Sequence, residues 1–237
     1  MVKARPLIAA GAVIAALAVL LSLGSWQMLR RAEKHVLIAR IEVQMQAPPV
    51  VLPAAINDPA AFDYRRVTVR GRYLHGREML LLNRVRNGVA GIHVITPLVR
   101  EDGPTVLVDR GWAPLARPAD DPAFVGQPPG PVTISGVARV PVKTGAFTPD
   151  NEPARGLWFS VDLAAMAAAK GIGPVAPVLV VADTRPDGIR KYPIPVPVRA
   201  GLRDDHLQYA VTWYSLALVL VGVVIAARRR RRPASEP

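Results

Sequence analysis

The side chains best suited to chemistry lie where the last apolar stretch of the chain begins. His206, Tyr209 and Trp213 are spaced i, i+3 and i+7, so they share one face if this stretch is a helix. Ala210 is small and leaves room beside them. An imidazole next to two amphipathic rings is a candidate binding site, with His206 as the candidate metal ligand.

A second group of such side chains follows the first apolar stretch. At about 1.5 Å per helical residue, Arg30 lies ~6 Å beyond Trp26, and His206 lies ~4.5 Å outside the second stretch. Arg30, Arg31 and Trp26 are therefore expected near the depth of His206. His35 is ~16 Å above the exit of the first helix and is not expected to form a bis-histidine site with His206.

The same residues admit a plainer interpretation. Trp26, Tyr209, Trp213 and Tyr214 can form an aromatic belt at a membrane surface, with His206 as a polar residue of that interface. Aromatic belts are general in membrane proteins and histidine ligands are rare. The residues alone therefore favour the belt.

Other polar side chains are expected to be structural. His75 sits at a predicted turn and His93 on a predicted strand, neither with a second histidine or a carboxylate at metal-ligand spacing. Asp109 and Arg110 are expected to form an ion pair at a strand end, with Gly111 as a bulge or tight bend.

Enzyme signatures are missing from the sequence. No G-x-S-x-G elbow precedes Ser160 and Asp162, and the pair Gly171 and Gly173 runs directly into Pro174, which excludes a dinucleotide-binding loop. The chain has no cysteine, so disulfides, thiolate metal sites and CxxC redox chemistry are excluded. We expect a protein that is not an enzyme.

Two apolar stretches are long enough to cross a membrane. Residues 209–227 carry no charge over nineteen residues, about 28 Å as a helix, and residues 7–26 reach ~30 Å. A cleaved signal peptide is the alternative for 7–26, but no A-x-A-like site follows it. Arg228 to Arg232 mark the cytoplasmic side of the second helix. Both termini are therefore expected in the cytoplasm and the central region outside.

The predicted plan has six parts. They are a cytoplasmic tail (1–6), transmembrane helix 1 (7–26), a helical extension (27–47), an extracytoplasmic β-rich domain (48–208), transmembrane helix 2 (209–227) and a basic cytoplasmic tail (228–237). The two tails, at +2 and +4, hold half of the formal net charge of +12. Membrane topology explains such tails, and no basic stripe interleaved with aromatics is present, so no nucleic-acid partner is expected.

Short segments of alternating apolar residues predict strands in the central region. The predicted strands are 64–73, 78–86, 91–100, 105–112, 132–140, 158–161 and 178–182, with a long loop at 114–131 and a proline-rich extended segment at 185–198. A helix is expected from Asp162, its N-cap, to Lys170, with Gly171 just past its end. The predicted fold is a membrane protein in which two transmembrane helices flank a mainly antiparallel, α+β and barrel-like extracytoplasmic domain.

Several motifs follow one another in an order that covers nearly the whole chain. They are Leu23-Gly-Ser-Trp-Gln-Met-Leu-Arg-Arg-Ala-Glu-Lys34, Tyr64-Arg-Arg-Val with Gly71-Arg-Tyr73, Gly91-Ile-His-Val-Ile-Thr-Pro-Leu98, Val106-Leu-Val-Asp-Arg-Gly-Trp-Ala-Pro114, Trp158-Phe-Ser-Val-Asp-Leu163 and His206-Leu-Gln-Tyr-Ala-Val-Thr-Trp-Tyr214. With these motifs and two predicted spans, the chain resembles the surfeit-locus family of cytochrome c oxidase assembly factors.

The resemblance implies a function. It implies an assembly factor of the bacterial inner membrane, with a periplasmic central domain, that helps to mature subunit I of a haem-copper oxidase. The implied cofactor is haem a, and the implied partners are oxidase subunit I, other oxidase assembly factors and membrane lipid. The alternative is a scaffold that holds subunit I without contacting haem.

The resemblance also implies a site, with the histidine just before the second span as the haem ligand. The residues expected to contact haem are His206 at the iron, Arg30 or Arg31 at the propionates, and Trp26 and Trp213 along the ring, with Tyr209 on the same face. Asp204 and Asp205 depart from the family pattern, in which an amide is expected before the histidine. A carboxylate there would either favour imidazolium, which cannot ligate iron, or accept Nδ1–H and orient the ring.

Overall fold

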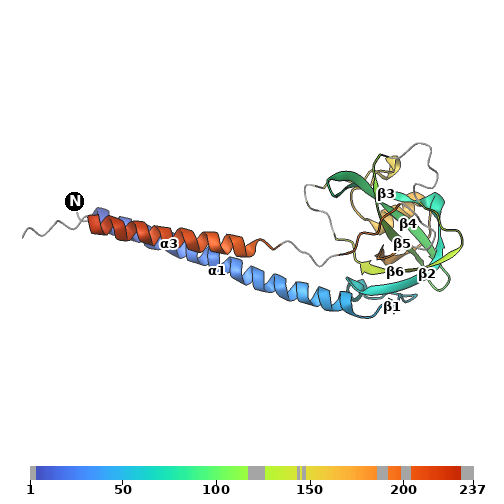
Figure 1. The fold of residues 1–237 in the computed structure, drawn as a ribbon, viewed down its shortest axis with the longest axis horizontal. Helices are drawn as coiled ribbons and strands as arrows, with labels where there is room; N and C mark the ends of the chain where they lie inside the picture. Colours follow the sequence, from blue (N-terminus) through green and yellow to red (C-terminus); the bar gives the residue numbers. More distant parts are fainter. Residues whose placement is uncertain are drawn as a thin grey trace, which may run out of the picture. The chain divides into compact units, whose positions relative to one another are not determined.

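The structure is a computed structural model that describes residues 4–116, 126–142, 145, 148–185, 192–198 and 204–230 (Figure 1). Parts of the predicted N-terminal tail, the 114–131 loop, the 185–198 segment and the basic C-terminal tail lie outside the described residues. The chain divides into two compact units, residues 1–40 with 200–237 and residues 41–199.

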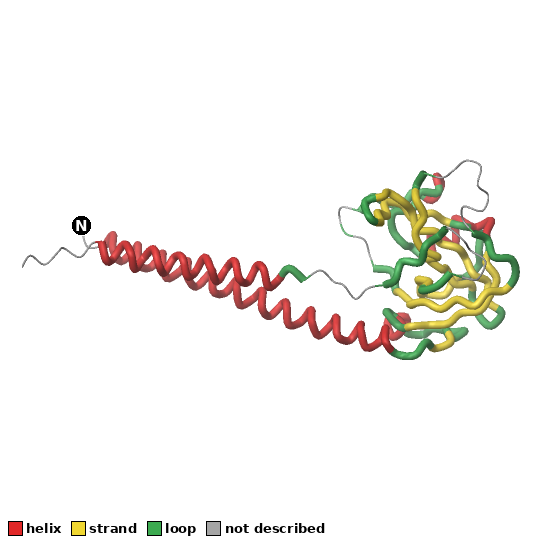
Figure 2. Tube along the Cα trace, in the orientation of Figure 1, coloured by secondary structure: helices red, strands yellow, loops and turns green. Residues whose placement is uncertain are grey.

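Two long helices make up most of the first unit. Helix α1 (Ala4–Gln46) and helix α3 (His206–Arg230) lie side by side and run in opposite directions (Figure 2). Both are long and apolar enough to cross a membrane. Large apolar side chains on both helices are exposed, for example Leu7 at 75% and Leu218 at 72%. Such an exposed apolar surface is compatible with a helix pair that lies in a membrane.

Strands dominate the second unit. In the described residues the strands are β1 (Val50–Val51), β2 (Arg66–Tyr73), β3 (Met79–Arg86), β4 (Val89–Arg100), β5 (Thr105–Pro114), β6 (Pro131–Arg139) and β7 (Val175–Ala182). They form one sheet in the order β1-β2-β6-β7-β5-β4-β3, and β2 also pairs with β4. This extra pairing joins β2, β6, β7, β5 and β4 into a closed ring, so the sheet is barrel-like as predicted.

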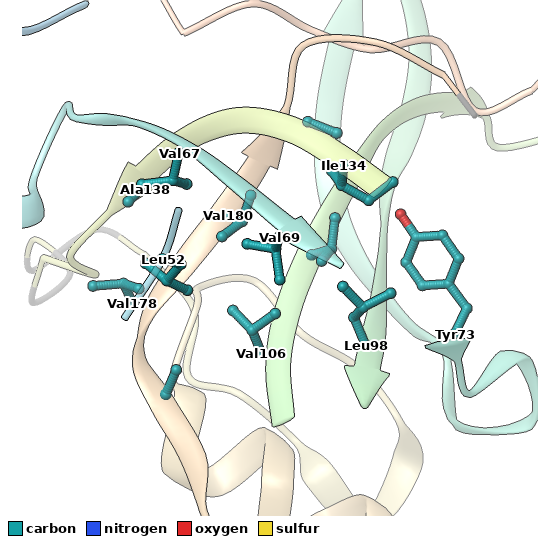
Figure 3. Close-up of a cluster of buried hydrophobic side chains, with 13 residues drawn as sticks. Leu52, Val67, Val69, Tyr73, Leu98, Val106, Ile134, Ala138, Val178 and Val180 are labelled. Atoms are coloured by element: carbon teal, nitrogen blue, oxygen red, sulfur yellow. The ribbon is translucent and has the colours of Figure 1, made fainter. Parts of the chain in front are cut away.

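The barrel interior is filled by small and β-branched side chains. Val69, Leu98, Val106, Ile134 and Val180 point into it from five different strands (Figure 3). A second buried cluster lies on the other face of β4, β5 and β7, and residues of β3 and of helix α2 (Leu163–Lys170) also contribute to it. Its members are Met79, Leu81, Ile95, Leu107, Trp158, Met166 and Leu179. Central strand β5 is buried on both faces, which explains its nearly continuous apolar sequence.

Most predicted strands are present. In β2, Val67, Val69, Gly71 and Tyr73 are buried, as the alternation predicts. The pairing is mainly antiparallel, although β1 pairs with β2 and β7 with β5 in parallel. The sequence did not predict β1, and β7 begins at residue 175 rather than 178.

The prediction of a strand at 158–161 is wrong. Trp158 makes a single bridge to Leu81, and the next residues are not in a strand. The side chain of Asn151 hydrogen-bonds the backbone of this segment, as a neighbouring strand would. Its Oδ1 accepts hydrogen bonds from the backbone N–H groups of Phe159 and Ser160, at 2.9 and 3.0 Å, and its Nδ2 donates to the Ser160 carbonyl. One side chain thus satisfies the polar groups that a strand would leave for a partner.

Helix α2 (Leu163–Lys170) has the predicted ends. The Asp162 carboxylate accepts a hydrogen bond from the N–H of Ala165 at 3.0 Å, and Gly171 adopts the left-handed conformation just past the last turn. Met166 anchors the helix in the second buried cluster.

Replacing Asp162 with alanine should destabilise the barrel unit by about 1 kcal/mol, because the first turn of α2 loses its cap. Urea unfolding of the full chain in detergent, followed by the fluorescence of buried Trp158, measures this loss. Asp162→Asn keeps an acceptor oxygen and should lose much less. Equal losses in the two variants would contradict the capping role.

Candidate functional site

The two helices of the first unit approach closely at one glycine. A Cβ at Gly24 would come within 2.7 Å of the Tyr214 ring, so only glycine allows this approach without a shift. The Tyr214 hydroxyl and the Ser25 Oγ are 3.2 Å apart, which ties the same two turns by a hydrogen bond. Ala210 and Ala217 of α3 are almost fully buried, at 1% and 5% exposure. Small residues and one tyrosine therefore set the spacing of the helices.

His206 is oriented by Gln27 on the opposite helix. The Nδ1 of His206 lies 2.7 Å from the Oε1 of Gln27. With the amide oxygen of Gln27 as the acceptor, Nδ1 is the nitrogen that donates the proton. In the neutral ring, the lone pair is then on Nε2, which no described residue contacts by a hydrogen bond. This arrangement places one nitrogen atom with a lone pair, which can bind a metal ion, at the start of α3.

Asp204 connects the start of α3 to two side chains of α1. Its Oδ1 accepts a hydrogen bond from the N–H of His206 at 3.2 Å and so caps the helix. Its Oδ2 accepts from His35 Nε2 at 2.8 Å and lies 3.6 Å from the Nε of Arg31. Partial burial raises the pKa of Asp204, but the hydrogen bonds from His206 and His35 and the charge of Arg31 outweigh it. The pKa of the carboxyl is therefore below its ordinary value, and Asp204 is ionised at neutral pH.

The structure shows which groups Asp204 contacts. The carboxylate does not accept from the ring of His206, because Gln27 occupies Nδ1. Asp204 instead binds the backbone of His206 and the side chains of Arg31 and His35. The ring of His206 therefore hydrogen-bonds a neutral amide through Nδ1.

The other predicted site residues differ in how close they lie to His206. Arg31 is next to the His206 turn through Asp204, whereas Arg30 points to Glu33, with Nη1 to Oε2 at 2.9 Å. The guanidinium of Arg30 also lies 5.9 Å from the centre of the Trp26 ring. Trp26 is 50% exposed.

The aromatic residues of α3 do not all share the environment of His206. Tyr209 is 54% exposed, whereas Trp213 is half-buried. The more buried side of α3 runs through His206, Ala210 and Ala217, with Tyr214 against α1. Tyr209 is therefore turned away from the helix pair.

Sequence reasoning missed Gln27 and the contact between His35 and Asp204. A signal was present, because Gly24, Gln27, Arg31 and His35 are spaced i, i+3, i+7 and i+11 and so lie along one side of α1. Counting the rise per residue gave the depth of each side chain and ignored its direction around the helix. In the described part of the chain, no group of three or more His, Asp or Glu residues could hold a metal ion. A single imidazole can serve as an axial ligand of a metal ion that is already held by a macrocycle, as iron is in haem.

A polar network lies at one end of the barrel in the second unit. The Oε1 of Glu78 accepts hydrogen bonds from Arg110 Nη1 at 2.8 Å and from Thr96 Oγ1 at 3.1 Å, and His75 Nδ1 lies 3.3 Å away. The guanidinium of Arg110 lies 4.9 Å from the centre of the Tyr73 ring. Burial raises the pKa of the Tyr73 phenol well above its ordinary value, so this group stays neutral.

The predicted ion pair between Asp109 and Arg110 is wrong. Neighbouring residues of a strand point to opposite faces, so Arg110 turns to Glu78 on the interior side and Asp109 to the other face. There the Oδ2 of Asp109 accepts from His93 Nδ1 at 2.7 Å. His93 thus has a carboxylate partner that its sequence neighbours did not reveal. Gly111 forms the predicted bulge, since two residues of β5 face one residue of β4 at this point.

The fold and the site together define a class of protein. Two helices, each long and apolar enough to cross a membrane, flank a barrel-like α+β domain and present one oriented histidine at the start of the second helix. The SURF1 family model matches residues 14–218. The chain belongs to the SURF1 family.

Relatives from several organisms match most of the chain. The chain is 33% identical over 219 residues to a SURF1-like protein of Monosiga brevicollis, covering 88% of this chain and 83% of the relative. It is 36% identical over 211 residues to human surfeit locus protein 1, covering 82% of this chain and 69% of the human protein. The rat protein of the same name is 34% identical over 209 residues, with coverage of 82% and 67%. The SURF1 family is known as a family of cytochrome oxidase assembly factors.

Proposed function

We propose that this protein is an assembly factor for a haem-copper oxidase that binds haem a through His206 and delivers it to subunit I. The observation that supports this most directly is the contact between His206 and Gln27. With the proton on Nδ1, the lone pair of Nε2 can bind a metal, and no residue that the structure describes hydrogen-bonds this nitrogen. Haem iron accepts such a nitrogen as an axial ligand.

Arg30 and Arg31 are the candidate partners for anionic groups of the cofactor. Both already have carboxylate neighbours, Glu33 for Arg30 and Asp204 for Arg31. The pair of Arg30 with Glu33 is exposed on both sides, so it contributes little stability and exchanges easily for another anion. We assign Arg30 to a propionate and leave Arg31 with Asp204, where it holds the start of α3.

The membrane and its orientation are part of the proposal. Arg228, Arg229 and Arg230 form the last turn of α3, and such a cluster favours the cytoplasmic side. With two spans, the start of α1 is also cytoplasmic. His206 then lies at the outer surface of the bacterial inner membrane, on the same side as the barrel domain. Oxidase subunit I and membrane lipid are the proposed partners of the two helices.

The haem-binding role is tested by one pair of variants. The full chain is purified from cells that make haem a, and the absorption spectrum of bound haem is compared with that of His206→Ala. We expect His206→Ala to lose most of the bound haem. His35→Asn is the matched control, because it removes the other histidine of the same cluster and should keep the spectrum.

Two results would contradict the proposal. An unchanged spectrum in His206→Ala would remove this residue as the ligand. Stable copurification of subunit I with both the normal chain and His206→Ala, without haem in either, would favour a scaffold that holds subunit I without haem.

A further inference from the structure

The second unit contains a cavity that the haem proposal does not use. It has a volume of about 600 Å³, within the range that holds a small organic ligand. Strands β3, β4, β5, β6 and β7 contribute to its walls, together with residues 196–198 of the extended segment. Backbone hydrogen bonds in both directions between Trp112 and Ile194, at 2.7 and 2.8 Å, fix this segment against β5.

A bulge in β5 positions the Asp109 carboxylate, which lines the cavity. Gly111 has a φ of 116°, and a Cβ there would lie 2.1 Å from the Ile194 carbonyl oxygen, so a glycine is required. The N–H of Gly111 donates to Asp109 Oδ1 at 2.9 Å, while Asp109 Oδ2 accepts from His93 Nδ1. The Asp109 side chain is only 7% exposed. The pair is therefore built into the sheet.

The charged side chains that line the cavity differ in their partners. His93 and Asp109 bind each other. Arg139 is paired with Asp63, with Nε to Oδ1 at 2.9 Å, and its guanidinium stacks 3.8 Å from the centre of the Tyr64 ring. Arg84 also lines the cavity, and its guanidinium has no ion pair or hydrogen bond with any residue that the structure describes. Among the described residues of the lining, Arg84 is therefore the cation without an acidic partner, and we take it as the group that meets a ligand.

The rest of the wall is mostly apolar. The side chains that provide this surface include Leu81, Phe159, Leu179, Val181, Val196 and Val198. An apolar wall with a single unpaired cation complements a molecule with an apolar body and one anionic end. The planar fork of arginine matches carboxylate and phosphate oxygens, each of which can accept two parallel hydrogen bonds.

We propose that this cavity binds an amphiphile with one oxyanion head group, which Arg84 contacts, while the valine-rich wall packs against the apolar chain. The shared chemistry is an apolar chain that ends in a carboxylate or a phosphate monoester. This site is separate from His206 and does not depend on the haem proposal.

Photolabelling of the full chain in lipid nanodiscs tests the site. The probe is a long-chain fatty acid that carries a diazirine on its chain, and the adducts are located by peptide mass spectrometry. We expect adducts on peptides that contain Phe159 and residues 196–198. Arg84→Gln should reduce them about tenfold or more, because a charge-assisted contact to the head is lost. Arg84→Lys should retain most of the labelling.

Matched controls separate the site from general lipid contact. Arg70 is an exposed arginine of β2 that does not line the cavity, and Arg70→Gln should label as the normal chain does. Adducts on α1 and α3 report lipid contact and should not change in any variant. Thermal unfolding of each variant checks that its barrel is intact.

Competition between unlabelled ligands and the probe, measured on the unaltered protein, tests the proposal even if a variant misfolds. Unlabelled fatty acid or an alkyl phosphate should displace the probe from the cavity peptides, and the stronger competitor identifies the head group. A fatty alcohol of the same length should displace it poorly. Equal competition by the alcohol, labelling confined to the helices, or cavity labelling unchanged in a folded Arg84→Gln would each overturn the proposal.

Discussion

Replacing Glu78 with alanine is expected to lower the free energy of unfolding of the barrel unit by about 3–5 kcal/mol. The side chain of Arg110 is only 2% exposed, and Glu78 is its carboxylate partner at 2.8 Å. Without Glu78 the guanidinium would stay buried beside the Tyr73 ring, Thr96 and the carbonyl of Gly126. None of these neutral groups balances its charge.

The comparison with glutamine separates charge from hydrogen bonding. Glu78→Gln keeps an oxygen that can accept from Arg110 and Thr96, so it should cost clearly less than Glu78→Ala. Glu101→Ala is the control, because Glu101 is exposed and should lose within ~0.5 kcal/mol. The measurement is urea unfolding of the full chain in detergent. If Glu78→Ala and Glu101→Ala unfold at the same urea concentration, the network does not stabilise the barrel.

The sequence predicted the local parts of this fold because their signals are local. The alternation in β2 and the cap residues Asp162 and Gly171 depend on neighbours along the chain. The closure between Gly71 to Tyr73 of β2 and β4, and the position of β7 between β5 and β6, depend on distant pairing. No pattern within a single segment encodes such a pairing.

The difference between local signals and distant pairing also explains why the sequence did not reveal the partners of Asp109 and Arg110. Strand periodicity would have separated the two side chains, because adjacent residues point to opposite faces. Their actual partners, His93 and Glu78, come from other strands. The expected ion pair followed sequence proximity and ignored the direction of the side chains.

Gln27→Ala is expected to weaken haem binding by roughly 10–100-fold, the usual effect of removing a group that orients a metal-ligating histidine. This prediction rests on the proposed role of His206. Gln27 lies two residues beyond Ser25, at the turn where α1 and α3 are in contact, so its amide can reach the ring of His206. Without the amide, Nδ1 loses its acceptor, and the ring is free to rotate or to change tautomer. Haem titration of the purified chain, followed by visible absorption, measures the affinity.

Two comparisons identify the reason for any loss of affinity. Gln27→Glu keeps an acceptor at the same length and adds a negative charge, which favours the protonated ring in the haem-free protein. Its haem affinity should therefore recover as pH rises, whereas that of Gln27→Ala should not, because no pH restores the missing acceptor. Met28→Leu alters the adjacent exposed side chain and should bind as the normal chain does. If Gln27→Ala binds haem as tightly as Met28→Leu, orientation by Gln27 is not what makes His206 a ligand. A pH-dependent recovery confined to Gln27→Glu would instead tie the affinity to the protonation state of one imidazole, which is the step that the contact between Gln27 and His206 controls.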